Sequence, residues 1–222
     1  VMVSVSSTND PTSPRCVYQF PGRFNPTTAD DAWFDFPKVG VTHDPSNLGA
    51  SRLLIGGNLF RFSDDSFLTN TVFEINKQQL DSCASAGFTR WTGFTDAGGG
   101  LAFTPVPATD YDDTAGYGWY VLFARFGSGT GITVWRNRFG TGFEQFFVAT
   151  AGYANPPNAT QPGTATRIDT IDDRLQSAVT RYGKTWGIHA VAVGGCGPGN
   201  DTAGLHLFSI DTPKSAAAPR LV

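Results

Sequence analysis

WYVLFARFGSGTGITVW, residues 119–135, is the stretch that decides the fold class. It begins with an apolar run and passes through a glycine-rich turn. It then continues in Ile132-Thr133-Val134, where apolar and polar side chains alternate. Alternation with a period of two is typical of a strand that packs on one face. The stretch therefore predicts two antiparallel strands joined by a turn.

The same pattern occurs three times along the chain. In each copy an apolar strand is followed by a polar or glycine-rich turn and a second strand that begins with Thr or Gly. The copies are Leu53–Phe62 with Thr71–Ile75, Trp119–Phe126 with Gly131–Trp135, and Trp186–Val193 with Gly204–Phe208. The sequence between them has no helical pattern long enough for the crossovers of a parallel sheet, apart from a short turn expected at Lys77–Ala84. Antiparallel meanders remain, as in a propeller, a sandwich or a barrel.

We predict a single all-β domain over residues 1–222. The recurring unit favours a β-propeller of roughly three or four antiparallel blades, with a β-sandwich as the alternative. The 26 Gly and 14 Pro require frequent turns and short strands, while 40% hydrophobic and 13% aromatic residues are enough for a core. Three segments rich in Pro, Gly, Asn and Asp are predicted to be loops: 7–32, 95–118 and 152–166.

Charge and hydropathy argue against two classes of partner. The formal net charge is −3 and only 16% of residues are charged, which provides no electrostatic surface for nucleic acid or an anionic membrane. No apolar run approaches the roughly 20 residues that span a bilayer. The first residues already have the pattern of a strand, so we expect the chain to be processed or to lack an N-terminal part.

Cysteines and glycosylation motifs bear on where the protein works. Cys16, Cys83 and Cys196 are far apart and form no CxxC pair, which argues against zinc. One disulfide with a spare thiol, three reduced thiols, and pairing of a cysteine with an absent segment all remain open. Asn158 and Asn200 begin Asn-x-Thr motifs and are candidate glycosylation sites in surface loops. Glycosylation at either position would require a eukaryotic secretory source.

Two motifs carry a family resemblance. The first is FDFPKVGV at 34–41, preceded by a strand-like 3–11 segment that ends in Asp-Pro; the second is QPGT at 161–164 with IDTIDDRL at 168–175. In this order they resemble the signatures of a little-characterised group of secreted bacterial β-propeller proteins. The resemblance covers roughly residues 1 to 210. It implies an internal run of blades, whose ring is completed by the remainder of the same propeller or by another protein chain.

The first motif contains two candidate ligand-binding residues. Asp35 and Lys38 flank Pro37 at the start of a strand, and the inner strands of propellers present their ends to a central channel. Both side chains are therefore candidates for contact with a sugar or a peptide. The alternative is structural, with Asp35 closing the turn and Lys38 paired with it or with another blade.

The second motif holds the densest group of charges. Asp169, Asp172 and Asp173, together with Asp35, are the candidate catalytic residues, because glycoside hydrolysis needs two carboxylates that flank one bond. Arg174 is the third candidate for ligand binding. The alternative is that Asp169 and Asp172 close a β-turn while Arg174 bridges neighbouring blades.

Other sites receive weaker support from the sequence. The acidic loops 63–65 and 109–113 resemble Ca²⁺ ligand sets without matching the full loop motif, so structural Ca²⁺ is the only cofactor considered and no metal ligand is assigned. His189 and His206 lie in apolar strands and are expected to be packed side chains. No Gly-x-Ser-x-Gly motif exposes a serine nucleophile.

The sequence predicts an extracellular binding or scaffold module whose ligand is a glycan or a protein. A glycosidase-type hydrolase and a structural subunit of a surface assembly are the alternatives. Catalysis requires two carboxylates that converge in a cleft, and binding requires exposed aromatic side chains beside polar groups. Assembly requires a large apolar terminal face.

Overall fold

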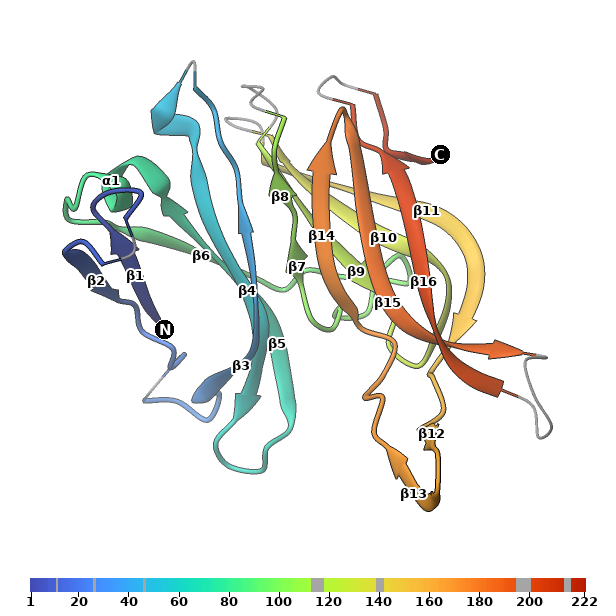
Figure 1. The fold of residues 1–222 in the computed structure, drawn as a ribbon. Coiled ribbons are helices and arrows are strands. Elements are labelled where there is room, and N and C mark those ends of the chain that lie inside the picture. The colour runs from blue at the N-terminus through green and yellow to red at the C-terminus, as the bar shows by residue number, and fades with distance from the viewer. Residues whose placement is uncertain are drawn as a thin grey trace.

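The chain forms antiparallel β-sheets stacked face to face (Figure 1). The structure is a computed structural model, and the residues that it describes are 1–10, 12–25, 27–45, 47–112, 118–138, 142–194, 201–213 and 217–222. Within this part of the chain none of the sheets closes on itself. The fold is therefore all-β, as predicted, and the stack resembles a sandwich with more than two layers.

The first sheet is a four-stranded meander in the order β3-β4-β5-β6. A hairpin of β1 and β2 covers its outer face together with the short helix α1, in which Leu80 is buried. A 3-10 turn, η1, connects β3 to β4. The bounds are β1 Met2–Ser6, β2 Arg15–Gln19, β3 Ala32–Val41, η1 Leu48–Ala50, β4 Arg52–Arg61, β5 Phe67–Asn76, α1 Lys77–Asp81 and β6 Phe88–Thr92.

The second and third sheets follow the same plan. The second has the order β11-β10-β9-β7, and the third has the order β17-β16-β15-β14-β8, in which only β8 pairs in parallel. The small hairpin β12–β13 projects from the link between them (Figure 1). The bounds are β7 Val106–Pro107, β8 Thr109–Asp110, β9 Trp119–Ala124, β10 Ser128–Arg138, β11 Gly142–Ala154, β12 Ala159–Gln161, β13 Thr164–Ile168, β14 Leu175–Arg181, β15 Lys184–Gly194, β16 Asp201–Asp211 and β17 Arg220–Leu221.

Two apolar layers hold the three sheets together. Leu54 and Val72 of the first sheet pack against Trp119, Val121 and Phe123 of the second. The other face of the second sheet packs against the third through a separate cluster. Alternate residues of β9 thus face opposite layers, which explains why the whole strand is buried and apolar in sequence. The main members of the cluster between the second and third sheets are Val106, Tyr120, Leu122, Ile132, Val134, Leu175, Phe208 and Ile210.

One strand from each sheet meets the others near the middle of the stack. Strand β7 contacts β3, β4 and β14, and β14 also contacts β3. Glycines permit this approach: a Cβ atom at Gly56 would lie 2.4 Å from the carbonyl oxygen of Pro105, and one at Gly40 would lie 2.8 Å from that of Ala108. We call this convergence of β3, β7 and β14 the inner junction.

The structure confirms the three repeated strand pairs and corrects the loop prediction. Strands β4–β5, β9–β10 and β15–β16 are antiparallel neighbours, and α1 lies inside the segment expected to hold a helical turn. The segments 7–32, 95–118 and 152–166 are not simple loops, because they contain β2, β7 with β8, and β12. Pairing with neighbouring strands overrode the loop-like composition. Cys16 and Cys83 form a disulfide, and Cys196 lies outside the described residues.

Candidate functional site

A bulge in β3 places Asp35 and Lys38 on the same side of the first sheet. Asp35 pairs with Asn58 and Lys38 with Gly56, so Phe36 and Pro37 together oppose a single residue of β4. Phe36 adopts a left-handed backbone conformation with φ 54°, which few non-glycine residues do. The bulge turns the charged end of β3 toward the inner junction.

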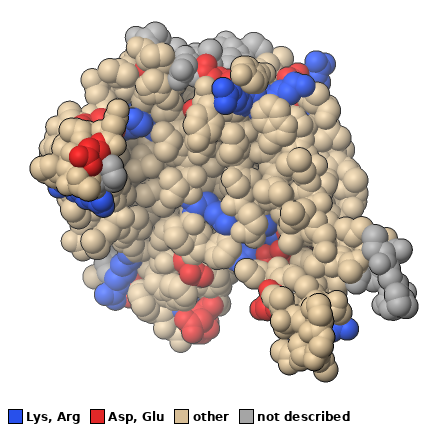
Figure 2. Space-filling view, in the orientation of Figure 1, with Lys and Arg blue, Asp and Glu red and all other residues tan. Residues whose placement is uncertain are grey.

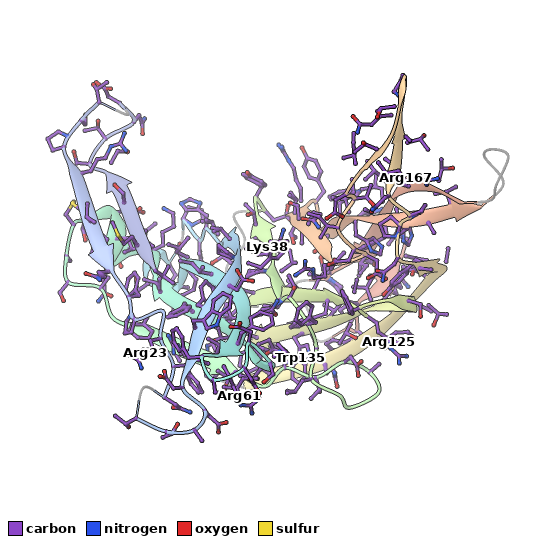
Figure 3. The ribbon with its side chains drawn as sticks, turned by 90° about the horizontal axis from the view of Figure 1, so that it is seen from below. Arg23, Lys38, Arg61, Arg125, Trp135 and Arg167 are labelled. Carbon is purple, nitrogen blue, oxygen red and sulfur yellow. A yellow bond between two sulfur atoms is a disulfide. The ribbon has the colours of Figure 1, made fainter. Side chains whose placement is uncertain are left out.

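Lys38 connects the first sheet to the third. Its Nζ donates hydrogen bonds to the side-chain oxygen of Gln176 at 2.9 Å and to the Gln176 carbonyl at 3.1 Å. In Figure 3 it lies between the strands of the first sheet and those of the other two. Burial, and then the nearby positive charge of Arg174, lower the pKa of Lys38. Its ammonium is therefore already engaged within the protein.

Arg174 also spans the junction. Its Nε donates to Asp172 at 2.7 Å, and both side chains are only 13% exposed. Its guanidinium lies 4.1 Å from the ring centre of Phe36 and 5.2 Å from that of Phe103. The Nζ of Lys38 lies 4.5 Å from the Phe36 ring centre, so that ring contacts two cations from different sheets. The structure thus brings residues of the two sequence motifs together.

The carboxylates of the second motif have separate partners. Asp169 accepts a hydrogen bond from the Ile171 N–H and closes a turn, and Asp172 does the same for Arg174. Asp173 is fully buried and accepts from the Gly127 N–H at 2.9 Å, and burial raises its pKa. Catalysis by these residues or by Asp35, and ligand binding by Asp35, Lys38 or Arg174, stay predictions. The described contacts of Asp169, Asp172, Lys38 and Arg174 are those of the structural alternatives.

A sizeable cavity lies elsewhere, on the side of the second sheet that faces the first. It has a volume of about 740 Å³. Gly131, Thr133 and Phe147 line its floor, because Thr133 pairs with Phe147 and residues two apart on β10 share a face. The turn between β9 and β10 and the loop that begins at Asp96 form its walls. The lining residues are Asp96, Ala97, Gly98, Arg125, Ser128, Gly129, Thr130, Gly131, Thr133, Phe147, Gly152, Tyr153 and Ala154.

Glycines and a bulge open this cavity. The pairing of β10 with β11 shifts between Gly129 and Gly131, which leaves Thr130 without a partner in the ladder. A Cβ at Gly131 would lie 2.4 Å from the Phe147 ring, so the ring lies directly over the glycine backbone. Phe147 nevertheless remains 51% exposed. The cavity thus combines an exposed aromatic ring with hydroxyl and backbone polar groups. We call it the Phe147 cavity.

Hydrogen bonds hold the wall of the Phe147 cavity that is formed by the loop beginning at Asp96. The Oδ1 atom of Asp96 accepts from the N–H groups of Gly98 at 2.8 Å and Gly100 at 3.2 Å, which fixes the loop. Gln145 and Trp135 donate to the Thr95 carbonyl at 2.7 and 2.9 Å and attach that loop to the second sheet. Such a site is largely formed before any ligand arrives.

A histidine pair, of which His189 is buried and His206 partly exposed, lies behind the cavity. The Nδ1–H of His189 donates to the Asp173 carbonyl at 2.7 Å, and the Nε2 of His189 lies 3.0 Å from Nδ1 of His206. The ring of Tyr153 meets that of His189 edge to face, with centroids 4.7 Å apart. Burial lowers the pKa of both histidines. His189 is fully buried, which confirms the expectation of a packed side chain.

Carboxylates in the acidic loops accept hydrogen bonds from backbone N–H groups and thereby fix the backbone conformation. Asp64 accepts from the Ser66 N–H at 3.0 Å, and Asp112 accepts from the N–H groups of Tyr182 and Gly183. Asp113 lies outside the described residues. Among the residues that are described, no three His, Cys, Asp or Glu side chains are grouped so as to hold a metal ion. Structural Ca²⁺ stays a prediction.

The surface offers few further indications of a partner. On the face shown in Figure 2, basic and acidic side chains are interspersed, and most of the surface carries neither. Asn158 is exposed beside β12, and Asn200 lies outside the described residues, so glycosylation at both stays a prediction. The described helices include none that is long and apolar enough to cross a bilayer.

Arg125, Asp96 and Phe147 were missed by the sequence analysis. The available signal was the glycine-rich turn at 127–131, which the sequence analysis interpreted only as the link between two strands. No family model matches the chain, and the searches of curated proteins and of solved structures found no match either.

Proposed function

We propose that the chain is a ligand-binding module, built on a propeller-type stack of sheets in a secreted or cell-surface protein, that binds a saccharide in the Phe147 cavity. One observation carries the proposal: a cavity of about 740 Å³ has an exposed aromatic ring on its floor beside polar groups. This is the combination that separates binding from the catalytic and assembly alternatives.

The arrangement of the sheets supports the propeller-type scaffold. Three sheets of similar plan stack in sequence order, and one strand of each reaches the inner junction. Residues of both family-like motifs meet there, through Lys38, Phe36 and Arg174. A ring of blades brings its inner strands together in the same way. The Cys16–Cys83 disulfide supports an oxidising compartment, since such bonds are rare in the cytosol.

The chemistry of the Phe147 cavity suits a saccharide. A pyranose ring presents an apolar face of C–H groups, which packs on an aromatic ring, and a rim of hydroxyls, which needs hydrogen-bond partners. Phe147 supplies the ring. Ser128, Thr130 and Thr133 supply hydroxyls, and Asp96 supplies a carboxylate oxygen.

The same cavity gives less support to a glycosidase. Hydrolysis needs two carboxylates that flank the scissile bond. Among the described residues that line the Phe147 cavity, Asp96 is the one acidic side chain, and its Oδ1 atom already accepts two backbone hydrogen bonds. Binding without bond cleavage is therefore the function that the geometry favours.

A saccharide-binding assay tests the proposal. The native protein is titrated calorimetrically against neutral and acidic trisaccharides, with the matched variants Phe147→Ala and Phe62→Ala. Phe62 is 56% exposed and lies outside the cavity, so it controls for loss of an exposed ring. We expect Phe147→Ala to weaken binding about tenfold and Phe62→Ala to leave it unchanged.

A second variant fills the cavity without removing Phe147. Thr130 is exposed and has no ladder partner, so Thr130→Trp places a large side chain in the Phe147 cavity at little cost to the sheet. We expect it to abolish binding while the folded far-UV circular dichroism spectrum is retained. Binding that survives both Thr130→Trp and Phe147→Ala would place the ligand elsewhere and overturn the proposal.

A further inference from the structure

Within the residues that the structure describes, Arg125 is a positive charge without a partner. It lies in the turn between β9 and β10, where it lines both the Phe147 cavity and a smaller neighbouring cavity of about 170 Å³ that also contains Asp96. In the described part of the chain its guanidinium makes no hydrogen bond or ion pair. Other arginines are engaged, for example Arg52 with Glu74, Arg136 with Glu144 and Arg174 with Asp172.

Buried side chains hold the turn that carries Arg125. The Arg125 N–H donates to the Tyr153 hydroxyl at 2.8 Å, and that hydroxyl donates to the Gly131 carbonyl at 3.2 Å. Burial raises the pKa of Tyr153 to about 12, so the hydroxyl keeps its proton. On the other side of Arg125, the Gly127 N–H donates to the buried carboxyl of Asp173. The backbone at Arg125 is therefore fixed before a ligand binds.

Asp96 supplies the complementary group. Its Oδ1 atom holds the loop, while its Oδ2 atom makes no hydrogen bond to the described residues and can accept from a ligand hydroxyl. Asp96 and Arg125 line the same space without forming an ion pair, since no contact within 4.0 Å joins them in the described structure. The Phe147 cavity thus offers one unpaired cation, one acceptor and one aromatic ring.

We infer that the ligand is an acidic saccharide, a uronic-acid oligomer whose carboxylate is bound by Arg125. This inference rests on the proposed function, because it assigns a chemical class to the saccharide of the Phe147 cavity. A guanidinium matches a planar carboxylate through two parallel hydrogen bonds. Phe147 packs on the sugar ring, and Asp96 accepts from a hydroxyl of the same or the neighbouring unit.

Calorimetric titration of the native protein with matched sugars tests the inference. The probes are trisaccharides of galacturonic, glucuronic, guluronic and mannuronic acid, the same compounds with methyl-esterified carboxyls, and a sulfated neutral trisaccharide. We expect at least one uronate to bind more tightly than its methyl ester. Arg125→Gln should reduce the affinity for that uronate about 10- to 100-fold and leave the affinity for the ester unchanged. Arg181→Gln, which removes an exposed arginine that contacts Tyr182 away from the cavity, should change neither.

The outcomes separate this inference from the proposed function. If esters and uronates bind equally well, or if Arg125→Gln has no effect, the acidic class is wrong while saccharide binding stands. If the sulfated sugar binds as tightly as the best uronate, Arg125 is a general anion site and the carboxylate assignment is overturned. If no trisaccharide binds to the native protein, both the inference and the proposed function fail.

Discussion

The inner junction and the Phe147 cavity use similar residues in opposite ways. At the junction, Lys38 binds Gln176 and Arg174 binds Asp172. The guanidinium of Arg174 also packs on the ring of Phe36. At the cavity, Arg125 and the ring of Phe147 remain available. The charged positions that are most conspicuous in the sequence thus hold sheets together. The site that can accept a ligand is formed by an unremarkable arginine beside a glycine-rich turn.

The largest expected effect is a difference between Arg174 and Arg125 in what each contributes to the free energy of unfolding. Arg174→Ala leaves Asp172 partly buried without its cation and removes the packing between Phe36 and Phe103. We expect the free energy of unfolding to fall by about 3 kcal/mol, with partial recovery in Arg174→Lys. Arg125→Ala should change it by less than about 0.5 kcal/mol. Chemical denaturation of both variants checks this, and equal losses would remove the distinction between the two regions.

A glycine pair sharpens the same comparison. A Cβ at Gly56 would lie 2.4 Å from the backbone of Pro105 at the inner junction, whereas one at Gly152 in the Phe147 cavity would meet only an oxygen 3.9 Å away. We expect Gly56→Ala to lower the free energy of unfolding by about 2 kcal/mol because backbone must move. Gly152→Ala should stay within about 0.5 kcal/mol of the native protein. Similar denaturation midpoints for the two variants would show that β7 is not pressed against the first sheet.

The smallest effect is a dependence on pH behind the cavity. Burial lowers the pKa of His189 and His206, whereas the unfolded chain has histidines of pKa 6.5. Below pH 6.5 the unfolded chain therefore binds more protons, and the free energy of unfolding should decrease as the pH falls. His206→Gln keeps a donor for His189 and removes one titrating group, so it should flatten this decrease.

Asp173 also makes stability depend on pH, and its contribution has to be separated from that of the histidines. Burial raises the pKa of its carboxyl, so from pH 3.8 upward its contribution to stability declines as the pH rises, opposite in sign to that of the histidines. The comparison is therefore between the native protein and His206→Gln at each pH, by urea denaturation. Parallel curves for the two proteins around pH 6 would contradict a role for His206.

The sequence was sufficient for the strands but not for the cavity. Period-two alternation at Ile132 and Val134 identified β10 correctly, because one face of that strand packs against the third sheet. The pairing of Lys38 with Gln176 could not be found in this way, since 138 residues separate them and only the stacking of sheets brings them together. No local pattern marks the register shift beside the Phe147 cavity, where Thr130 of β10 stands opposite residues 150–152 of β11.

The family-like motifs marked positions where the sheets meet, but they did not identify residues of a catalytic or binding site. Gly40 in the first motif lies where β7 crosses, and Phe36 supplies the bulge and the ring at the junction. Asp169 and Asp172 turned out to close turns, which a list of acidic residues cannot distinguish from catalysis. Burial and hydrogen-bond partners decide such cases, and both depend on the tertiary fold.

The Cys16–Cys83 disulfide makes the first sheet sensitive to the compartment in which the protein resides. It ties the β1–β2 hairpin to the residues after α1, and the hairpin covers apolar side chains such as Phe20 and Ile55. In the loop-entropy model, a crosslink between residues 67 positions apart lowers the conformational entropy of the unfolded chain. This raises the free energy of unfolding by about 4 kcal/mol. Under reducing conditions only noncovalent contacts would hold the hairpin against the first sheet. Its opening would expose apolar side chains to solvent, so that oxidation of the two thiols would protect the protein against association.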